Sequence, residues 1–119
     1  MNQGGLGFDS AWDSLYAVTA AITEPRIENI NLSALAGNLS GSLRRVIFTE
    51  NHDEVGHPPD SRRIPGRIDP LDHFSWQSKT RSLLGAEVLM TTAGVPILFQ
   101  GQEFLGDHDL HSLARTHLV

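Results

Sequence analysis

The chain has 119 residues, of which 39% are hydrophobic and 19% are charged, and its formal net charge is −5. This composition predicts one globular domain of ordinary size, and the acidic balance argues against nucleic acid as a partner, because nucleic acids bind basic patches. There is no cysteine, which excludes disulfides and thiolate zinc sites. The sequence has neither a signal-peptide pattern nor an apolar run of the roughly 20 residues that a membrane span needs. We therefore expect a cytoplasmic protein with no membrane partner.

The first third of the chain predicts a short strand and two helices. Residues 4–8 (GGLGF) are a glycine-rich lead into a short apolar piece, and a helix follows with Ser10 as its N-cap. Pro25 ends this helix. Its predicted buried face consists of Leu15, Tyr16, Thr19 and Ile22. A second short helix is predicted over residues 32–39, closed by Gly41.

The clearest strand is predicted over residues 44–51 (RRVIFTEN). Its apolar residues are consecutive instead of alternating, which indicates burial on both faces, as in a parallel sheet. Residues 52–72 are predicted to form a long loop, because their prolines and glycines disfavour regular structure. Loops of this length inside compact domains are often functional.

The last third predicts a helix over residues 74–91, with Asp72 or Ser75 as its N-cap. The apolar stripe predicted to face the core consists of Trp76, Leu83, Leu84 and Val88. Residues 95–101 (VPILFQG) predict another apolar strand, with Pro96 near its beginning, where the missing N–H is tolerated.

The predicted order of elements is strand, helix, strand, helix, strand, and each clear strand runs into polar or ionisable residues. This is the α/β pattern of parallel strands joined by crossover helices. Ligands in such folds bind at the carboxyl ends of the strands. The residues that follow segments 44–51 and 95–101 are therefore the candidates for a functional site.

His52 and Asp53 directly follow the first of these strands. An aspartate at this place can accept two hydrogen bonds from vicinal sugar hydroxyls or stabilise developing positive charge, and a neutral histidine can donate a hydrogen bond to the same sugar. The alternative is that both residues only cap a turn. Spacing alone leaves both alternatives open.

Side chains that can bind metals occur in two loop groups. The first group is His52, Asp53, His57 and Asp60, and the second is His108, Asp109 and His111. Neither group matches a specific zinc pattern, such as two histidines four residues apart on a helix with a glutamate between them. We therefore expect no metal and no other cofactor.

The segment FQGQEF places Gln100, Gln102 and Glu103 just past the last strand. These residues can hydrogen-bond a ligand at the rim of a pocket or brace the site from behind, or they can simply end a buried strand. Trp12 can stack on a sugar ring or belong to the core. The glycine-rich start lacks the Lys-Ser/Thr of a phosphate loop, so nucleotide binding is not expected.

Three segments together resemble the α-amylase superfamily. VIFTENHDEVG (residues 46–56) is similar to the superfamily's seventh-strand motif, which is centred on His-Asp, and GVPILFQGQEFL (residues 94–105) is similar to its eighth-strand motif. GGLGFDSAWD (residues 4–13) resembles the sixth-strand segment of 1,4-α-glucan branching enzymes. The three motifs occur in the order of the family and together span nearly the whole chain.

The resemblance implies an α/β fold, a partial (β/α)₈ TIM barrel to which this chain contributes strands six to eight. It implies that Asp53 is the catalytic residue that stabilises the transition state, and that His52 hydrogen-bonds the sugar next to the broken bond. Further candidate substrate-binding residues are Asn51, Gln102, Glu103 and Trp12. Residues that shape the loop around them are Glu50, Glu54 and His57.

The implied activity is that of a branching enzyme, which cuts α-1,4 links in glycogen or amylose and forms α-1,6 branches. The family's nucleophile and acid/base follow strands four and five, so we expect these 119 residues alone to be inactive and to need the N-terminal half of the barrel. Residues 106–119 form a tail that departs from the family pattern, by truncation or divergence. The alternatives are an α-glucan hydrolase of the amylase or trehalose-releasing type, and a non-catalytic remnant that binds glucan or pairs with another chain.

Overall fold

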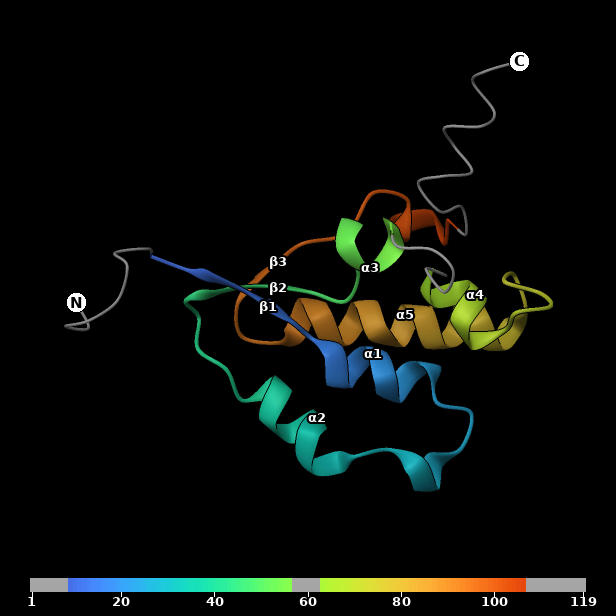
Figure 1. Ribbon diagram of the computed structural model, residues 1–119, viewed down its shortest axis with the longest axis horizontal. Helices are drawn as coiled ribbons and strands as arrows, with labels where there is room; N and C mark the ends of the chain where they lie inside the picture. Colours follow the sequence, from blue (N-terminus) through green and yellow to red (C-terminus); the bar gives the residue numbers. More distant parts are fainter. Residues whose placement is uncertain (1–8, 57–62, 107–119) are drawn as a thin grey trace, which may run out of the picture.

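The computed structural model describes residues 9–56 and 63–106. A sheet of three parallel strands runs through it, and the order of the strands in the sheet is also their order along the chain (Figure 1). The strands are β1 (Ala11–Ser14), β2 (Arg45–Phe48) and β3 (Val95–Pro96). The prediction of an α/β fold with parallel strands is confirmed. The strand predicted over residues 4–8 and the tail residues 107–119 lie outside the described residues.

The first strand and the first helix lie further along the chain than predicted. Residues expected to begin a helix form β1 instead, because they pair with β2 from Ala11 opposite Arg45 to Ser14 opposite Phe48. The ladder continues with a hydrogen bond of 2.8 Å from the Leu15 amide to the Phe48 carbonyl. Helix α1 (Tyr16–Thr23) begins only there, so the prediction of Ser10 as its N-cap is wrong.

Helix α1 packs against the long last helix through a face that differs in part from the predicted one. Its buried residues are Val18, Thr19 and Ile22, and Leu15 just before the helix is also buried. Tyr16 is exposed, so its assignment to the buried face is wrong. Two residues correspond to a turn of about 200° around a helix, which places Tyr16 on the side opposite Val18.

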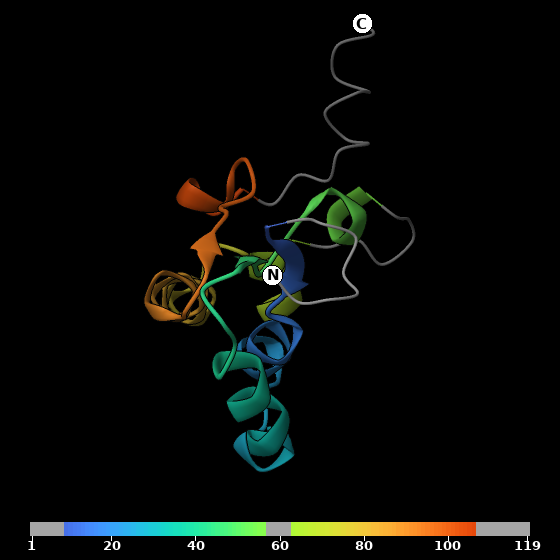
Figure 2. The same cartoon turned by 90° about the vertical axis from the view of Figure 1, so that its left-hand side faces the viewer.

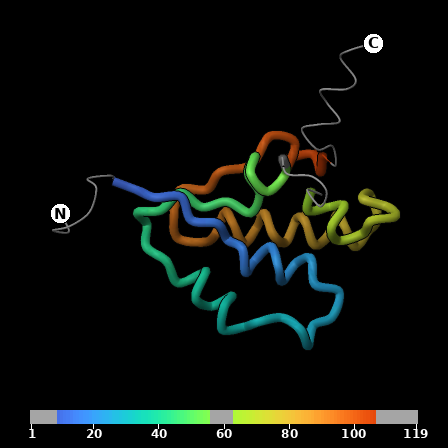
Figure 3. Tube along the Cα trace, viewed as in Figure 1, coloured from blue at the N-terminus to red at the C-terminus, as the bar shows by residue number. Residues whose placement is uncertain are grey.

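Helix α2 (Leu32–Leu39) has the bounds that were predicted for it. A short 3₁₀ helix, η1 (Ile27–Asn29), precedes it, and the Asn31 side chain caps it by accepting a hydrogen bond of 2.9 Å from the Ala34 amide. The chain then passes from α2 back to the start of β2 (Figure 3). This crossover puts β1 and β2 in parallel neighbouring positions.

The predicted loop over residues 52–72 contains two short helices, so the prediction of no regular structure is wrong for these parts. They are α3 (His52–Gly56) and α4 (Ile64–Ile68). The Asn51 side chain caps α3, and Pro65 occupies the first turn of α4, where its missing N–H costs nothing. His57 and Asp60 lie outside the described residues, as do His108, Asp109 and His111.

Helix α5 (Trp76–Thr91) has Ser75 as its N-cap, as predicted, but it buries a different face. Its buried residues are Ser78, Gly85 and Leu89, and Val88 lies half-buried against the core. The other three residues of the predicted stripe, Trp76, Leu83 and Leu84, are exposed, so this prediction is wrong for them. Gly85 faces α1, and a Cβ at this position would lie 2.6 Å from the Ile22 Cδ1, so the end of the Ile22 side chain would have to shift.

The predicted strand over residues 95–101 is too long. Only Val95 and Pro96 belong to β3, so Pro96 is the second and last residue of the strand, and the Ile97 amide then donates to the Ile47 carbonyl at 2.8 Å. The chain turns away at Gly101, which has a positive φ of 89°, and enters the 3₁₀ helix η2 (Gln102–Phe104).

The two faces of the sheet have different surroundings. Helices α1 and α5 lie on one side of the sheet, with α2 beyond α1 (Figures 1 and 2). The core on that side consists of Leu15, Val18, Ile47 and Leu89, with Leu35, Leu39 and Val88 packed around them. Trp12, Val46 and Val95 are register partners and share the opposite face, where Trp12 is 60% and Val95 56% exposed. The sheet therefore leaves an apolar row uncovered by the described residues.

Within residues 9–56 and 63–106, no helix is long and apolar enough to cross a membrane.

Gly94, in the turn before β3, is expected to be required for the fold. Its φ is 145°, and a Cβ at this position would lie 3.0 Å from Ile47 and 3.1 Å from the Arg45 carbonyl oxygen. We expect Gly94→Ala to lower the free energy of unfolding by about 1–3 kcal/mol. The control is Gly37→Ala in α2, where a Cβ meets nothing within 4 Å and helix propensity predicts a gain of about 0.5–1 kcal/mol. Chemical denaturation of both variants measures the difference, and similar midpoints would contradict the prediction.

Candidate functional site

The candidate site lies at the carboxyl ends of the strands. The backbone leaves β2 through Thr49 and Glu50 and enters α3 at His52, while the segment after β3 brings η2 to the same end of the sheet (Figure 1). The sequence predicted both segments as parts of one site. Side-chain contacts between the two segments show how closely they are joined.

Gln102 connects the ends of β2 and β3. Its amide nitrogen donates to the Thr49 hydroxyl at 2.7 Å, and its amide oxygen accepts from the Phe99 amide at 3.1 Å. Thr49 is fully buried, and its carbonyl accepts a hydrogen bond of 3.0 Å from the Thr19 hydroxyl in α1. Both ends of the Gln102 side chain are therefore engaged within the protein, and Gln102 acts as a brace beneath the site.

A buried ion pair lies next to this brace. The Arg63 Nε donates to Glu50 Oε2 at 3.0 Å, and the Arg63 Nη2 lies 3.0 Å from the same oxygen. Glu50 is 3% and Arg63 4% exposed. The other oxygen of Glu50 accepts a hydrogen bond from the Ile64 amide at the start of α4. Burial of both charges is tolerated because each is paired and hydrogen-bonded.

His52 and Asp53 lie on the surface above this buried layer. Their side chains are 60% and 67% exposed, and His52 Nε2 is 3.4 Å from Asp53 Oδ1. The Trp12 ring from β1 meets the His52 ring edge-on at 6.1 Å and the Phe48 ring at 5.4 Å between centroids. Trp12 is thus an exposed aromatic side chain beside the pair, which places it at the candidate site and outside the buried core cluster.

Asn51 and Glu54 hold α3 in position. The Asn51 Oδ1 accepts a hydrogen bond of 2.9 Å from the Glu54 amide, so Asn51 caps the helix. The Glu54 carboxylate accepts a hydrogen bond of 3.1 Å from the Ser14 hydroxyl at the end of β1. Partial burial raises the pKa of Glu54, and the Ser14 hydrogen bond and the charge of Arg67 act in the opposite direction. The folded state therefore favours the protonated form of Glu54 more than an unfolded chain does.

The structure brings part of the predicted residue set into one place. Trp12, His52 and Asp53 lie together, Asn51 caps the helix that carries the last two, and Gln102 lies beneath as a brace. Glu103 is exposed on η2, on the segment that follows β3. Among residues 9–56 and 63–106, no three His, Asp or Glu side chains are grouped to hold a metal ion.

Two hollows in the described part of the surface lie away from His52 and Asp53. One of about 200 Å³ lies between α1 and the segment from η1 to α2, lined by residues that include Glu24 and Asn31. A smaller one of about 20 Å³ lies between α4, α5 and η2, and Gln102 is among its lining residues. We base the candidate site on the chemistry and contacts of the strand ends, because the Glu24 and Asn31 oxygens of the larger hollow already accept hydrogen bonds from the protein.

The arrangement at the strand ends suits a polyhydroxylated ligand. An exposed carboxylate can accept hydrogen bonds from neighbouring hydroxyls, an imidazole can donate one, and an indole face can stack on a sugar ring. These groups come from two neighbouring strands, and a buried layer supports them. The Asp53 carboxylate can stabilise a positive charge that develops on a bound ligand.

The partnership of Glu50 with Arg63 was missed in the sequence analysis, which gave Glu50 only a part in shaping the loop. A partial signal was available, since Glu50 continues a buried strand without a break and Arg63 directly precedes the apolar pair Ile64 and Pro65. Charged residues in such apolar surroundings are buried as pairs. Which arginine pairs with which glutamate is decided by the fold.

Comparison of the chain with protein-family models, with curated proteins and with solved structures gave no match.

Proposed function

We propose that this chain is the part of an α-amylase-superfamily (β/α)₈ barrel that contains strands six to eight, and that the complete enzyme is a cytoplasmic glycosyltransferase similar to 1,4-α-glucan branching enzymes. It cuts α-1,4 links in a glycogen-type glucan and forms α-1,6 branches. The proposal rests on the three ordered motifs and on the carboxyl end of the central strand, where His52 lies beside Trp12 and Asp53 lies next to His52.

The arrangement of the strands fits the proposed barrel. Parallel strands that follow chain order, with their helices on one side, fit consecutive strands of a barrel and equally one βαβαβ half of a doubly wound sheet, so the choice of the barrel rests on the three motifs. The face opposite the helices carries the row of Trp12, Val46 and Val95, in which Trp12 and Val95 are exposed and Val46 is half-buried. In a closed barrel this face points inward, where side chains from the other strands cover it.

The site residues have distinct roles in this proposal. Asp53 stabilises the positive charge of the oxocarbenium-like transition state, and His52 hydrogen-bonds the sugar ring that carries it. Trp12 offers a surface on which a sugar ring can stack. Gln102 holds the ends of β2 and β3 together beneath them, and Asn51 positions α3. The nucleophile and the acid/base come from the N-terminal half of the barrel, and the reaction needs no cofactor.

Product analysis on amylose tests the proposal. The protein is expressed with its natural flanking coding sequence and incubated with amylose, and the products are followed by proton NMR of the anomeric region and by a reducing-end assay. We expect new α-1,6 signals without a matching rise in reducing ends. A rise in reducing ends alone would replace transfer by hydrolysis, and the absence of both products would leave a non-catalytic glucan-binding role.

A further inference from the structure

Two ion pairs lie at the two ends of the central strand β2, and they differ in burial: both partners are buried at the carboxyl end, whereas the Asp13 side chain at the amino end is 43% exposed. Glu50 and Arg63 pair at the carboxyl end, beneath His52 and Asp53. Arg45 pairs with Asp13 at the amino end, at 2.9 Å. Since both involve an arginine that is more than nine-tenths buried, they form a natural comparison between the functional and the opposite end of the same strand.

The carboxyl-end pair joins segments that are far apart in the sequence. Glu50 continues β2, Arg63 directly precedes α4, and the Arg63 Nη1 donates to the Gln100 carbonyl at 3.2 Å, on the segment after β3. The Arg63 guanidinium also lies 5.1 Å from the centre of the Phe99 ring. One side chain therefore ties together the segments that leave β2 and β3.

The ion pair is close to the site along the chain. Only Asn51 separates Glu50 from His52, and Asn51 caps the helix that carries both His52 and Asp53. A shift of the Glu50 backbone is therefore transmitted directly to the first turn of α3. Because the Glu50 carboxylate is held by Arg63 and by the Ile64 amide, its position depends on α4 as well as on β2.

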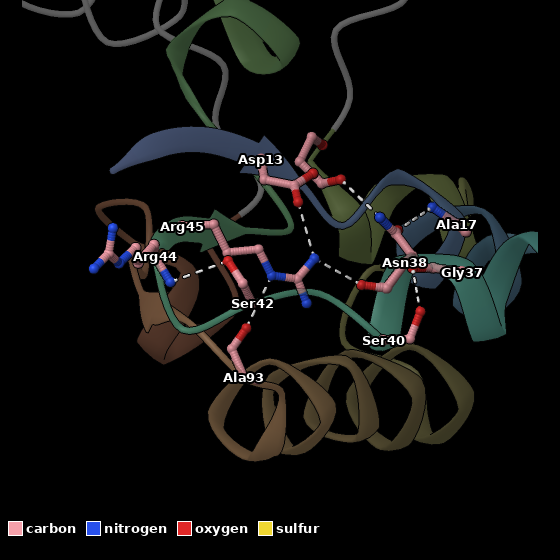
Figure 4. Close-up of polar contacts among 10 residues, drawn as sticks. Asp13, Ala17, Gly37, Asn38, Ser40, Ser42, Arg44, Arg45 and Ala93 are labelled. Carbon is pink, nitrogen blue, oxygen red and sulfur yellow. Dashed lines mark hydrogen bonds and ion pairs between the residues drawn. The ribbon is translucent and has the colours of Figure 1, made fainter. Parts of the chain in front are cut away.

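The amino-end pair lies at the opposite end of the sheet. Figure 4 shows the Arg45 side chain between the Asp13 carboxylate, the Asn38 carbonyl and the Ala93 carbonyl, each 2.9 Å away. These contacts join β1, α2 and the turn before β3. In parallel barrels the amino ends of the strands contribute to stability, and the carboxyl ends contribute to the reaction.

We infer that the Glu50–Arg63 pair positions His52 and Asp53 beside Trp12, and that the Arg45–Asp13 pair contributes to stability alone. The part of this inference that concerns turnover rests on the proposed function. A carboxylate that acts mainly in the transition state loses effect when it is displaced, so loss of the positioning pair lowers kcat and leaves KM nearly unchanged.

The experiment compares Glu50→Gln, Arg63→Met, the double variant of the two, and Asp13→Asn as the amino-end control, all in the protein with its natural flanking sequence. Each single substitution at the carboxyl end leaves a buried charge without its partner, so we expect Tm to fall by roughly 10 °C. The double variant removes both charges and keeps an acceptor for the Ile64 amide, so its Tm recovers. Its kcat stays about 100-fold low, because the link from position 63 to Gln100 is lost.

A second measurement does not depend on turnover. The Trp12 indole protons, assigned by their loss in Trp12→Phe, are examined for nuclear Overhauser effects to the His52 ring protons, since the two ring centres lie 6.1 Å apart. We expect these effects in the parent protein and in Asp13→Asn, and their loss in the double variant.

The outcomes separate the two proposals. Recovery of kcat together with Tm in the double variant, or retention of the nuclear Overhauser effects between Trp12 and His52, would overturn the positioning role. An equal fall in kcat in Asp13→Asn would overturn the distinction between the two ends. If the parent protein has no glucan turnover, or if Asp53→Asn leaves turnover unchanged, the proposed function fails, and the nuclear Overhauser measurement alone then decides the positioning role.

Discussion

Asp53→Asn is expected to lower kcat on α-glucan by about a thousand-fold in the protein with its natural flanking sequence. Removal of one group that stabilises charge in the transition state costs 10² to 10³ in rate in other enzymes, and a neutral amide cannot balance the charge of an oxocarbenium-like state. The fold should be unaffected, because the Asp53 side chain is two-thirds exposed and its ion pair with His52 contributes little to stability.

The measurement is kcat and KM for amylose together with the thermal unfolding curve of the variant. Glu87→Gln is the matched control, since Glu87 is an exposed carboxylate on α5, away from the strand ends. We expect the control to keep both its turnover and its Tm. Turnover of Asp53→Asn within a few-fold of the parent protein would remove Asp53 from the reaction and the main support for the enzyme proposal.

The 119 residues alone are expected to give no turnover of amylose. Turnover is expected to be absent, not merely slow, because two of the three catalytic carboxylates of the proposed family lie on other strands. The sheet also leaves Trp12 and Val95 exposed on the face opposite the helices, which other strands cover in the proposed barrel. The assay is reducing-end release and branch formation by the purified chain at high concentration. Co-expression with the segment that supplies strands one to five should restore turnover.

The control for this prediction is the isolated chain with Asp53→Asn, purified in the same way, because trace amylases from the expression host would act on the same substrate. Turnover that is present in the isolated chain and lost in this control would contradict the prediction. Such a result would mean that a nucleophile and an acid/base reside in the 119 residues after all.

Features of the fold that depend on local sequence were predictable. The run of apolar residues around Val46 predicted a buried parallel strand, and the structure pairs β2 on both sides in parallel. Helix α2 and most of α5 were predicted with nearly correct bounds, including the Ser75 cap, because caps and helical periodicity act over a few residues. The position of His52 and Asp53 after β2 followed from the strand alone.

Features that depend on contacts between distant segments were not predictable in the same way. The start of α1 was placed too early, because pairing with β2 draws residues 11–14 into the sheet against their local helix signals. The buried face of α5 was misassigned, because hydrophobicity pointed to Trp76 and Leu83 while the face that packs on α1 and the sheet carries Ser78, Gly85 and Leu89. Two of these buried residues are small or polar, and a hydrophobicity pattern does not identify them.

The sequence by itself determined which residues can perform chemistry and at which strand end they lie, because side-chain type and strand position are local properties. Only the tertiary structure decided how they are supported. It placed Trp12 beside His52, turned Gln102 inward toward Thr49, and paired Glu50 with Arg63 across two segments. The physical reason is that a buried charge requires a partner, but the identity of that partner depends on which segments the sheet and its helices bring together.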